Sequence, residues 1–516
     1  MLMLIVTMAI AAGRIAVVAS SDGLVPFLSA NDRSRWCTIA ALVEDGRYEI
    51  DRLQAITMFD PRLKREVRPW QTIDRVKHVG RDGIYHDYSS KPPLLPTMMA
   101  AVYAVWYWGT GVSLTEHPLL VGRLLLACIN LPLLWFLIAP VQALIVRHSR
   151  SPGGAIFSGA SICFATLLLP FTITLNNHLP AASATALTMW ILLDEQRVGR
   201  WTWMLVAGLA AGMIAANELP GLALLGLLCL MAGALNLRLT ATAFLPGVAI
   251  VGAGFFVTNW LAHESLRPPY AHRGIGPLLA TLPRDTQGPS VPIAPPIQAA
   301  LVEAGEPLEG PTLILGSKTP GRWMFLTQSG HQRYAVIRTH SHWRIHAWDD
   351  WYEYEGSYWV SDRRTGVDAG ESSRWRYLLH MTLGHHGLFS LTPIWFLSVL
   401  GVFCWLQSAS RPQRMMVAAI VVASLVCFGF YLSRPLIDRN YGGVSAGLRW
   451  MLWFSPAWVW LLIPAADYGS KRPLVWKICL TMLAISIFSA ATVLENPWQH
   501  PWLYRIGHDL GWLQNR

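Results

Sequence analysis

Hydrophobic residues in this chain of 516 residues gather into blocks about as long as a membrane is thick. A hydrocarbon core of about 30 Å is spanned by roughly 20 apolar residues in a helix. The pattern therefore predicts an all-α polytopic membrane protein. The blocks cover residues 2–25, 93–110, 118–146, 153–174, 180–195, 202–217, 219–236, 241–262, 383–406, 415–433, 448–466 and 474–493.

Basic residues in the short loops indicate how these blocks cross. If every block spanned the membrane, the basic loops would fall on both sides, against the tendency of Lys and Arg to stay inside. If 93–110 instead lies in the outer interface or re-enters, all of them become cytoplasmic. This block follows prolines and is rich in the aromatic residues found at headgroup depth. We therefore expect about eleven transmembrane helices plus one interfacial helix, with the N-terminus inside and the C-terminus outside.

This topology divides the chain into three regions. Residues 1–262 form an N-terminal transmembrane module that contains an outer loop, 29–92, and the interfacial helix 93–110. Residues 263–382 form an extracytoplasmic segment, and 383–516 form the C-terminal helices with a short outer tail. Within 263–382, aromatic and polar residues alternate after Tyr334 and after His342. Alternation of this kind is typical of strands and predicts a small mixed or β-rich domain.

Composition agrees with a membrane location and limits the classes of partner. The chain is 53% hydrophobic and 14% charged, whereas soluble proteins are about a quarter charged. The net charge of +10 does not indicate nucleic-acid binding, because the basic residues lie at span ends. Six of the seven cysteines fall in hydrophobic blocks and only Cys37 lies in a loop, which excludes an intrachain disulfide framework outside the bilayer. The first block carries Arg14 midway and lacks a charged start, so we expect a retained helix rather than a signal peptide.

The outer loop after the first block holds candidate catalytic residues. Asp32 could accept a proton from a nucleophile or hold a sugar or a metal, although an Asn or Asp at 31–32 also suits a helix N-cap. Lys91 lies before Pro92 and Pro93 at the start of an apolar block, where an ammonium could bind a lipid phosphate. A snorkelling lysine is the alternative. Tyr88 is a candidate sugar contact.

Other outer loops supply polar groups that would face the same side. Asn177 and His178 join two blocks and could hydrogen-bond a sugar or phosphate. Glu218 lies between two blocks, and an ionisable group near membrane depth is a functional-site hypothesis. Arg449 follows a glycine-rich stretch that could shape an anion pocket, or it could anchor the helix at the interface. Two further candidates for donor binding are His385 and His386, whose adjacency does not favour metal chelation.

At these residues the chain resembles a known group of enzymes. It is similar to the GT-C fold glycosyltransferases that use lipid-linked sugars, in particular the protein mannosyltransferase and aminoarabinose transferase branch (glycosyltransferase family 39-like). Those proteins carry an acidic residue after the first span, as at Asp32, and a Lys-Pro-Pro tract, as at Lys91. The resemblance covers roughly residues 1–200 best and implies that Asp32 is the catalytic acid. One departure is that residues 176–178 carry no second carboxylate, which counts against a two-carboxylate metal site.

The resemblance implies an activity and a location. We expect transfer of a sugar from a polyprenyl-phosphate carrier to a protein, lipid or glycan acceptor, in the bacterial inner membrane and on its extracytoplasmic side. Asp32 would activate the acceptor, while Lys91 and Arg449 would stabilise the departing phosphate. No cofactor is required by the sequence, and a divalent metal is left open. The alternative functions are a transporter or flippase and a non-catalytic binder of a lipid-linked glycan.

Overall fold

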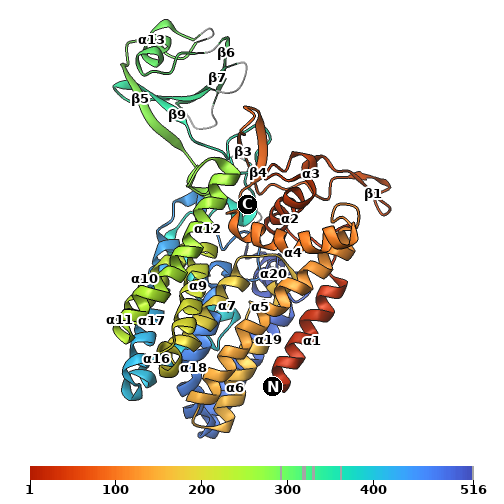
Figure 1. The fold of residues 1–516 in the computed structure, drawn as a ribbon, viewed down its shortest axis with the longest axis vertical. Coiled ribbons are helices and arrows are strands. Elements are labelled where there is room, and N and C mark those ends of the chain that lie inside the picture. Colours follow the sequence, from red (N-terminus) through yellow and green to blue (C-terminus); the bar gives the residue numbers. More distant parts are fainter. Residues whose placement is uncertain (291–292, 309, 317–320, 328–331, 361–362, 514–516) are drawn as a thin grey trace.

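The computed structural model describes residues 1–290, 293–308, 310–316, 321–327, 332–360 and 363–513. Within this part, each hydrophobic block of the sequence contains a helix, and most of these helices run side by side in one bundle (Figure 1). The helices are α1 (Leu2–Val17), α4 (Leu94–Thr110), α5 (Pro118–His148), α6 (Pro152–Phe164), α7 (His178–Leu192), α9 (Trp201–Asn217), α10 (Leu222–Leu235), α12 (Leu245–His263), α16 (Trp395–Ser408), α17 (Arg411–Ser433), α18 (Ser455–Ser470) and α19 (Pro473–Ala491).

Among the described residues, four helical segments are long and apolar enough to cross a membrane by length and composition: Pro118–His148, Leu237–His263, Arg411–Ser433 and Pro473–Ala491. Shorter apolar helices accompany them, among them α1, α6, α9 and α16. The multi-pass membrane character of the chain is thus supported. The expected number of about eleven spans, and their orientation, stay predictions.

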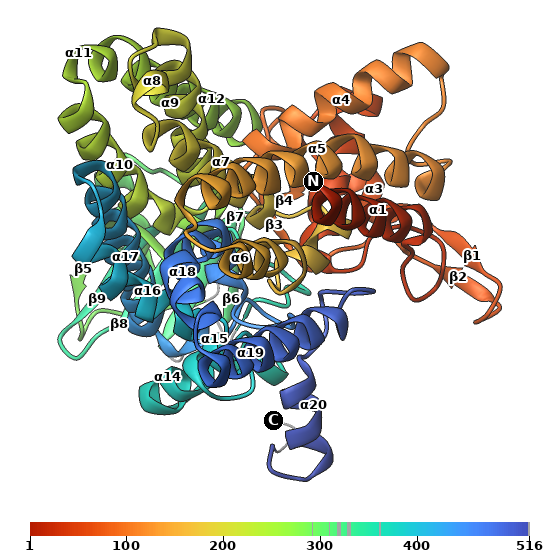
Figure 2. The same cartoon turned by 90° about the horizontal axis from the view of Figure 1, so that it is seen from below.

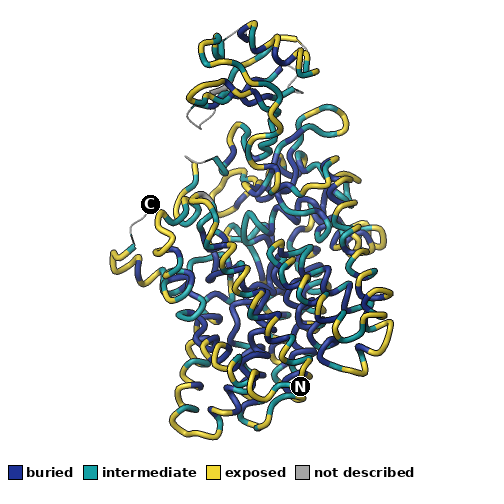
Figure 3. Tube along the Cα trace, turned by 90° about the vertical axis from the view of Figure 1, so that its left-hand side faces the viewer, coloured by how far each residue is buried: buried dark blue, intermediate teal, exposed yellow. Residues whose placement is uncertain are grey.

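The surface of the bundle is apolar where a bilayer would touch it. Figure 3 shows buried residues concentrated inside the bundle and exposed ones in the lower loops and the upper cap. Exposed side chains on the helices are often large and apolar, for example Ile250 and Phe256 of α12 and Leu425 of α17. Apolar surface on this scale is what contact with lipid requires.

Glycines let the bundle helices approach closely. A Cβ at Gly208 of α9 would overlap the backbone oxygen of Phe244, and one at Gly401 of α16 would overlap that of Leu461 in α18. Small residues at such crossings allow van der Waals contact between backbones, which drives helix packing in lipid. The helix α18 lies among its neighbours (Figure 2), and most of its residues are buried.

One end of the bundle is closed by a buried carboxylate. Asp467 of α18 accepts hydrogen bonds from the Ser149 hydroxyl at 2.7 Å, the Arg150 N–H at 2.7 Å and the Ser151 N–H at 3.0 Å. These donors belong to the turn between α5 and α6, and Gly154 leaves no room there for a side chain beside Asp467. A single carboxylate therefore joins three helices at this end.

The opposite end carries the polar loop that follows α1. It contains α2 (Ala30–Ala40), α3 (Asp51–Ala55) and two antiparallel hairpins. Helix α4 follows and runs across the end of the bundle (Figure 1). That orientation suits the interfacial helix expected at 93–110, whose depth in a membrane stays a prediction. The hairpin strands are β1 (Met58–Asp60), β2 (Arg65–Val67), β3 (Arg75–Val79) and β4 (Tyr85–Ser89).

The predicted β-rich region within 263–382 is confirmed. It is a five-stranded antiparallel sheet with the order β5-β9-β8-β7-β6, joined by α13 (Pro295–Glu303), and it projects beyond the polar end of the bundle (Figure 1). Phe325, Val336 and Ile345 lie in its own small core. After the last strand the chain returns to the bundle, where Tyr352 packs against β3 and β4. The strands are β5 (Ile275–Pro283), β6 (Thr312–Gly316), β7 (Arg322–Thr327), β8 (Arg333–Arg338) and β9 (His342–Trp348).

Candidate functional site

A cavity of about 730 Å³ lies where the polar loop meets the ends of the bundle helices. Its walls come from α2, from the segments before α4 and α7, from the end of α9, and from the loop that precedes Trp450. The returning chain contributes Tyr352 and Trp359. Segments far apart in the sequence thus enclose one polar space at the end of an apolar bundle.

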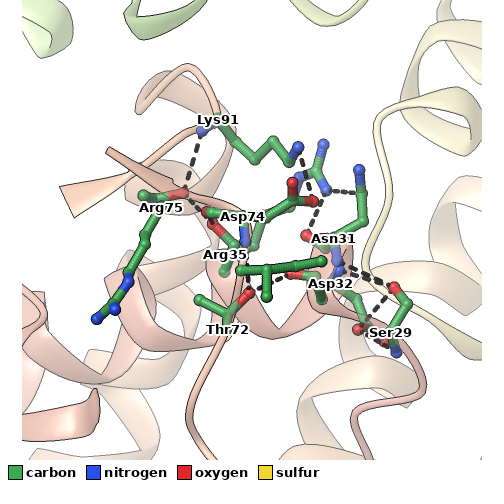
Figure 4. A network of polar contacts seen from close by, with 12 residues as sticks. Ser29, Asn31, Asp32, Arg35, Thr72, Asp74, Arg75 and Lys91 are labelled. Carbon is green, nitrogen blue, oxygen red and sulfur yellow. Dashed lines mark hydrogen bonds and ion pairs between the residues drawn. The ribbon is translucent and has the colours of Figure 1, made fainter. Parts of the chain in front are cut away.

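An ion pair between Lys91 and Asp74 forms one side of this cavity. The Lys91 Nζ lies 2.9 Å from the Asp74 Oδ2 (Figure 4). Pro93 caps the start of α4, and the Lys91 N–H donates to the Ser89 hydroxyl at 3.2 Å, so the lysine is held in the turn before the helix. Burial, aided by the positive charges of Arg35 and Arg449, lowers the pKa of Lys91 to about 8 despite its carboxylate partner.

A buried cation, Arg35, connects α2 to the start of α7. Its guanidinium donates to the backbone oxygen of Asn31 at 3.0 Å and to the Asn177 side-chain oxygen at 2.8 Å. Burial lowers the pKa of Arg35 to about 10, which still leaves it charged at neutral pH. Figure 4 shows Arg35 and Asn31 beside the Lys91–Asp74 pair.

Glu218 is buried in the break between α9 and α10 and has two partners. The Asn177 amide donates to its Oε1 at 2.7 Å, and the Nδ1 of His178 contacts the same oxygen. The backbone of Glu218 is extended, at φ −128° and ψ 105°, and Pro220 follows, so the helix does not continue through it. This break turns the carboxylate toward the turn at 177–178.

Arg449 completes the polar chain on the far side of His178. Its Nη1 donates to the His178 Nε2 at 3.3 Å, and its Nε donates to the Gly442 carbonyl at 3.0 Å. Because an arginine can only donate, His178 must accept at Nε2 and carry its proton on Nδ1, facing Glu218. Gly442 has φ +97°, and a Cβ there would lie 2.7 Å from the Arg449 Nε, so only glycine fits.

The structure therefore brings together five of the candidate residues named from the sequence. Lys91, Asn177, His178, Glu218 and Arg449 all line the same cavity. The sequence predicted only that their loops share one side of the membrane. The structure adds that the five side chains line a single cavity. Their roles in binding or catalysis stay predictions.

Asp32 lies outside the cavity, and its geometry is that of a capping residue. It is 0% exposed, and its carboxylate accepts from the N–H groups of Leu28, Ser29 and Arg33 at 2.7–2.9 Å. The expectation that Asn31 or Asp32 is the N-cap was wrong, because Ser29 is the N-cap and Asp32 completes a capping box (Figure 4). A carboxylate occupied in this way is poorly placed to take a proton from an acceptor.

Tyr88 and the paired histidines also lie away from the cavity. Tyr88 is buried in β4, donates to Glu49 at 3.2 Å and stacks on His78 with 4.1 Å between ring centroids. The expected contact of Tyr88 with a sugar therefore does not fit its position in the hairpin core. His385 lines a separate cavity and His386 packs against Tyr441, so neither reaches the site around Arg449.

Several cavity residues were not anticipated from the sequence. Arg35 follows Asn31 by one helical turn, and this spacing predicts that the two side chains lie on the same face of α2. Asp74, in contrast, reaches Lys91 only through the fold of the loop. Of the side chains that the structure describes, six cationic and four carboxylate ones line the cavity. The cations are Arg35, Lys91, Arg273, Arg364, Arg434 and Arg449, and the carboxylates are Asp74, Glu218, Asp368 and Asp438.

Comparison with known proteins gives little beyond this geometry. No family model matches the chain, and no curated protein matches it. Among solved structures, it is similar to the archaeal oligosaccharyltransferase AglB from Archaeoglobus fulgidus, described in complex with an inhibitory peptide and a dolichol-phosphate. The identity is 12% and the TM-score 0.41, over 96% of this chain. The chain spans 56% of the length of that structure.

Proposed function

We propose that this protein is a membrane glycosyltransferase that moves a sugar from a polyprenyl-phosphate carrier to an acceptor at the cavity around Lys91 and Arg449. The observation that carries the proposal is the meeting of two buried arginines, Arg35 and Arg449, with the partly buried Lys91, beside a carboxylate at the end of an apolar bundle. Buried charges are costly unless they serve a partner, and a lipid phosphate supplies the complementary charge.

The charge of the cavity suits a reaction that releases a phosphate. The donor is a phosphodiester with one negative charge, and the lipid phosphate that leaves carries up to two. Because cations outnumber carboxylates around the cavity, the negative charge that develops during departure is stabilised more than the charge of the bound donor. Such stabilisation is strong in a site with little water.

The edge of the cavity also suits a lipid tail. Leu219 and Phe430 line the cavity and are 46% and 38% exposed. Exposed apolar side chains at the mouth let a polyprenyl chain remain in the bilayer while its phosphate enters the polar space. We assign the site to the extracytoplasmic side of a bacterial inner membrane, in line with the distribution of basic loops.

Asp74 is the acid that we assign to catalysis in place of Asp32. In the proposed reaction its Oδ2 accepts the proton of the acceptor nucleophile, whose freed electron pair forms a bond to the anomeric carbon. The bond from that carbon to the phosphate oxygen breaks, and its electron pair stays on the lipid phosphate. When Lys91 turns toward the phosphate, the Asp74 Oδ2 leaves its ion pair and is free to accept the proton. Direct displacement predicts inversion at the anomeric carbon.

A transfer assay with purified protein in nanodiscs tests this function. A panel of polyprenyl-phosphate sugars and protein, lipid and glycan acceptors would be screened beside Asp74→Asn. Loss of a general base should lower turnover by about 10²- to 10⁴-fold. A matched control is Asp82→Asn, at a more exposed carboxylate in the same loop. Transfer that persists in Asp74→Asn contradicts its role, and donor binding without turnover for any acceptor favours a carrier or binding protein.

A further inference from the structure

A second group of ionisable side chains lies outside the proposed catalytic cavity. Glu371, His380 and His385 each present a ligand atom, and these atoms lie within 4.8 Å of one another. His380 lies in the last turn of α14 (Arg374–Thr382), Glu371 lies just before this helix and His385 just after it. The three line a cavity of about 790 Å³ together with Tyr504 of α20 (Trp502–Asp509).

The end of α14 is built to bring the histidines together. Gly384 lies so close to His380 that a Cβ there would be 2.8 Å from the His380 Cα. The chain can therefore fold back over the last turn, and the rings of His380 and His385 stack with centroids 3.9 Å apart. Neither residue spacing nor helix periodicity predicts this pair, because it depends on the turn after the helix.

Ring nitrogens in this region lack partners. In the part of the chain that the structure describes, His380 Nδ1, His386 Nε2 and His500 Nδ1 are buried without a hydrogen bond. Buried polar atoms normally have partners, so three such nitrogens in one cluster need an explanation. A bound cation would use the lone pair of His380.

We propose that Glu371, His380 and His385 bind a divalent first-row transition metal, with Zn²⁺ as the best match. Imidazole and carboxylate are its usual ligands, and three protein ligands leave one position open toward the cavity. At ligand distances of about 2.1 Å, the ligand atoms of a tetrahedral site lie about 3.4 Å apart, so small side-chain rotations complete the site.

The surrounding contacts orient these ligands. The Nδ1 atoms of His385 and His386 lie 2.5 Å apart, so one must donate to the other. If His385 donates, its Nε2 retains the lone pair that a metal needs. The Tyr441 hydroxyl donates to Glu371 at 3.1 Å. Such outer contacts fix the orientation of metal ligands in proteins.

The metal would also steady the loop that presents Arg449. The Glu371 N–H donates to the Arg439 carbonyl at 2.9 Å, and the Arg449 N–H donates to the Tyr441 carbonyl at 3.2 Å. Glu371 thus contacts Arg439 and Tyr441, which precede Gly442, and Tyr441 in turn accepts a hydrogen bond from Arg449. The metal stabilises this segment and takes no part in transfer.

Metal content tests the proposal without a transfer assay. Protein purified with a streptavidin-binding tag, which avoids added histidines, would be loaded with Zn²⁺, passed through a desalting column and measured by inductively coupled plasma mass spectrometry. We expect about one equivalent per chain, and a loss of more than about fivefold in His380→Ala and His385→Gln. The matched control is His340→Gln, at an exposed histidine between β8 and β9, which should retain the metal.

X-ray absorption of the loaded wild-type protein covers the case in which a variant does not fold. The spectrum should show nitrogen and oxygen ligands at about 2.0–2.2 Å, with the scattering of two imidazoles. Wild-type protein without stoichiometric metal, full retention in a folded His380→Ala, or a spectrum without imidazole would each overturn the proposal. None of these results bears on the transferase, whose test needs no metal measurement.

Discussion

Raising the pH should weaken phosphate binding at the proposed site through one residue, Lys91. Its pKa is lowered to about 8 by burial and by the neighbouring Arg35 and Arg449, whereas an exposed lysine titrates near pH 10.4. The two arginines stay charged throughout the range of interest. Between about pH 7 and pH 9 the site therefore loses one cation of the three.

The size of the effect follows from that pKa. With a pKa of about 8, the protonated fraction of Lys91 falls from about nine tenths at pH 7 to about one tenth at pH 9. If only the protonated form binds the phosphate, affinity is full below the pKa and falls about tenfold by pH 9, or about 1.4 kcal/mol. The ligand does not contribute, because a phosphate monoester with its second pKa near 6 is already doubly charged at pH 7.

The stability of the folded protein changes in the opposite direction to the affinity, because the lowered pKa of Lys91 makes stability rise with pH. A lysine whose pKa is lower in the folded state binds fewer protons there than in the unfolded chain. Over the interval from about 8 to the unperturbed value of 10.5, stability should therefore gain from this residue as pH rises. A loss of affinity without a fall in the unfolding temperature would separate binding from unfolding.

Isothermal titration calorimetry with farnesyl phosphate in detergent measures the affinity. The matched variant Lys91→Arg keeps its charge across this range, so its affinity should change by less than about twofold where the wild type loses about tenfold. Lys91→Met should bind weakly at every pH. An equal alkaline loss in Lys91→Arg, or a flat profile in the wild type, would refute the reasoning.

Three further changes separate binding, capping and packing. Gly442→Ala should weaken farnesyl phosphate binding more than about tenfold, because the added Cβ would displace Arg449. The control is Gly443→Ala, which also lies at positive φ but whose added Cβ would be 3.5 Å from its nearest neighbour, Asp368 Oδ1, and should not weaken binding to this extent. Asp32→Ala removes the acid of the capping box and should cost about 1 kcal/mol of stability in thermal unfolding. A folded variant that has lost turnover more than a hundredfold would return the catalytic role to Asp32. Asp467→Ala leaves several partly buried donors without their acceptor and should cost about 1–3 kcal/mol without changing the affinity. An altered affinity would show that the two ends of the bundle are coupled.

The helices and the small sheet could be predicted because their signals are local. Each hydrophobic block contains a helix, and the alternating stretches after Tyr334 and His342 lie in β8 and β9. Lys91, Glu218 and Arg449 could also be proposed, because each is a charged residue beside an apolar block. Such positions can be recognised in the sequence whatever the detailed packing.

The remaining site residues depend on contacts that the linear pattern does not contain. Asp74 meets Lys91 only when the loop folds over α2, and His380 meets His385 only through the turn at Gly384. Asp32 is different, because Ser29-Ala-Asn-Asp32 fits a capping box in which the acid is the third helical residue. The error there was to place the helix start two or three residues too late.

Cryo-electron microscopy of the protein in nanodiscs with a non-cleavable polyprenyl phosphonate sugar would locate the bound donor. We expect density for the phosphonate within hydrogen-bond reach of Lys91 and Arg449, for the polyprenyl tail beside Leu219 and Phe430, and for the sugar beside Asp74. Density for the ligand elsewhere on the protein, with this cavity holding only water, would contradict the proposed site.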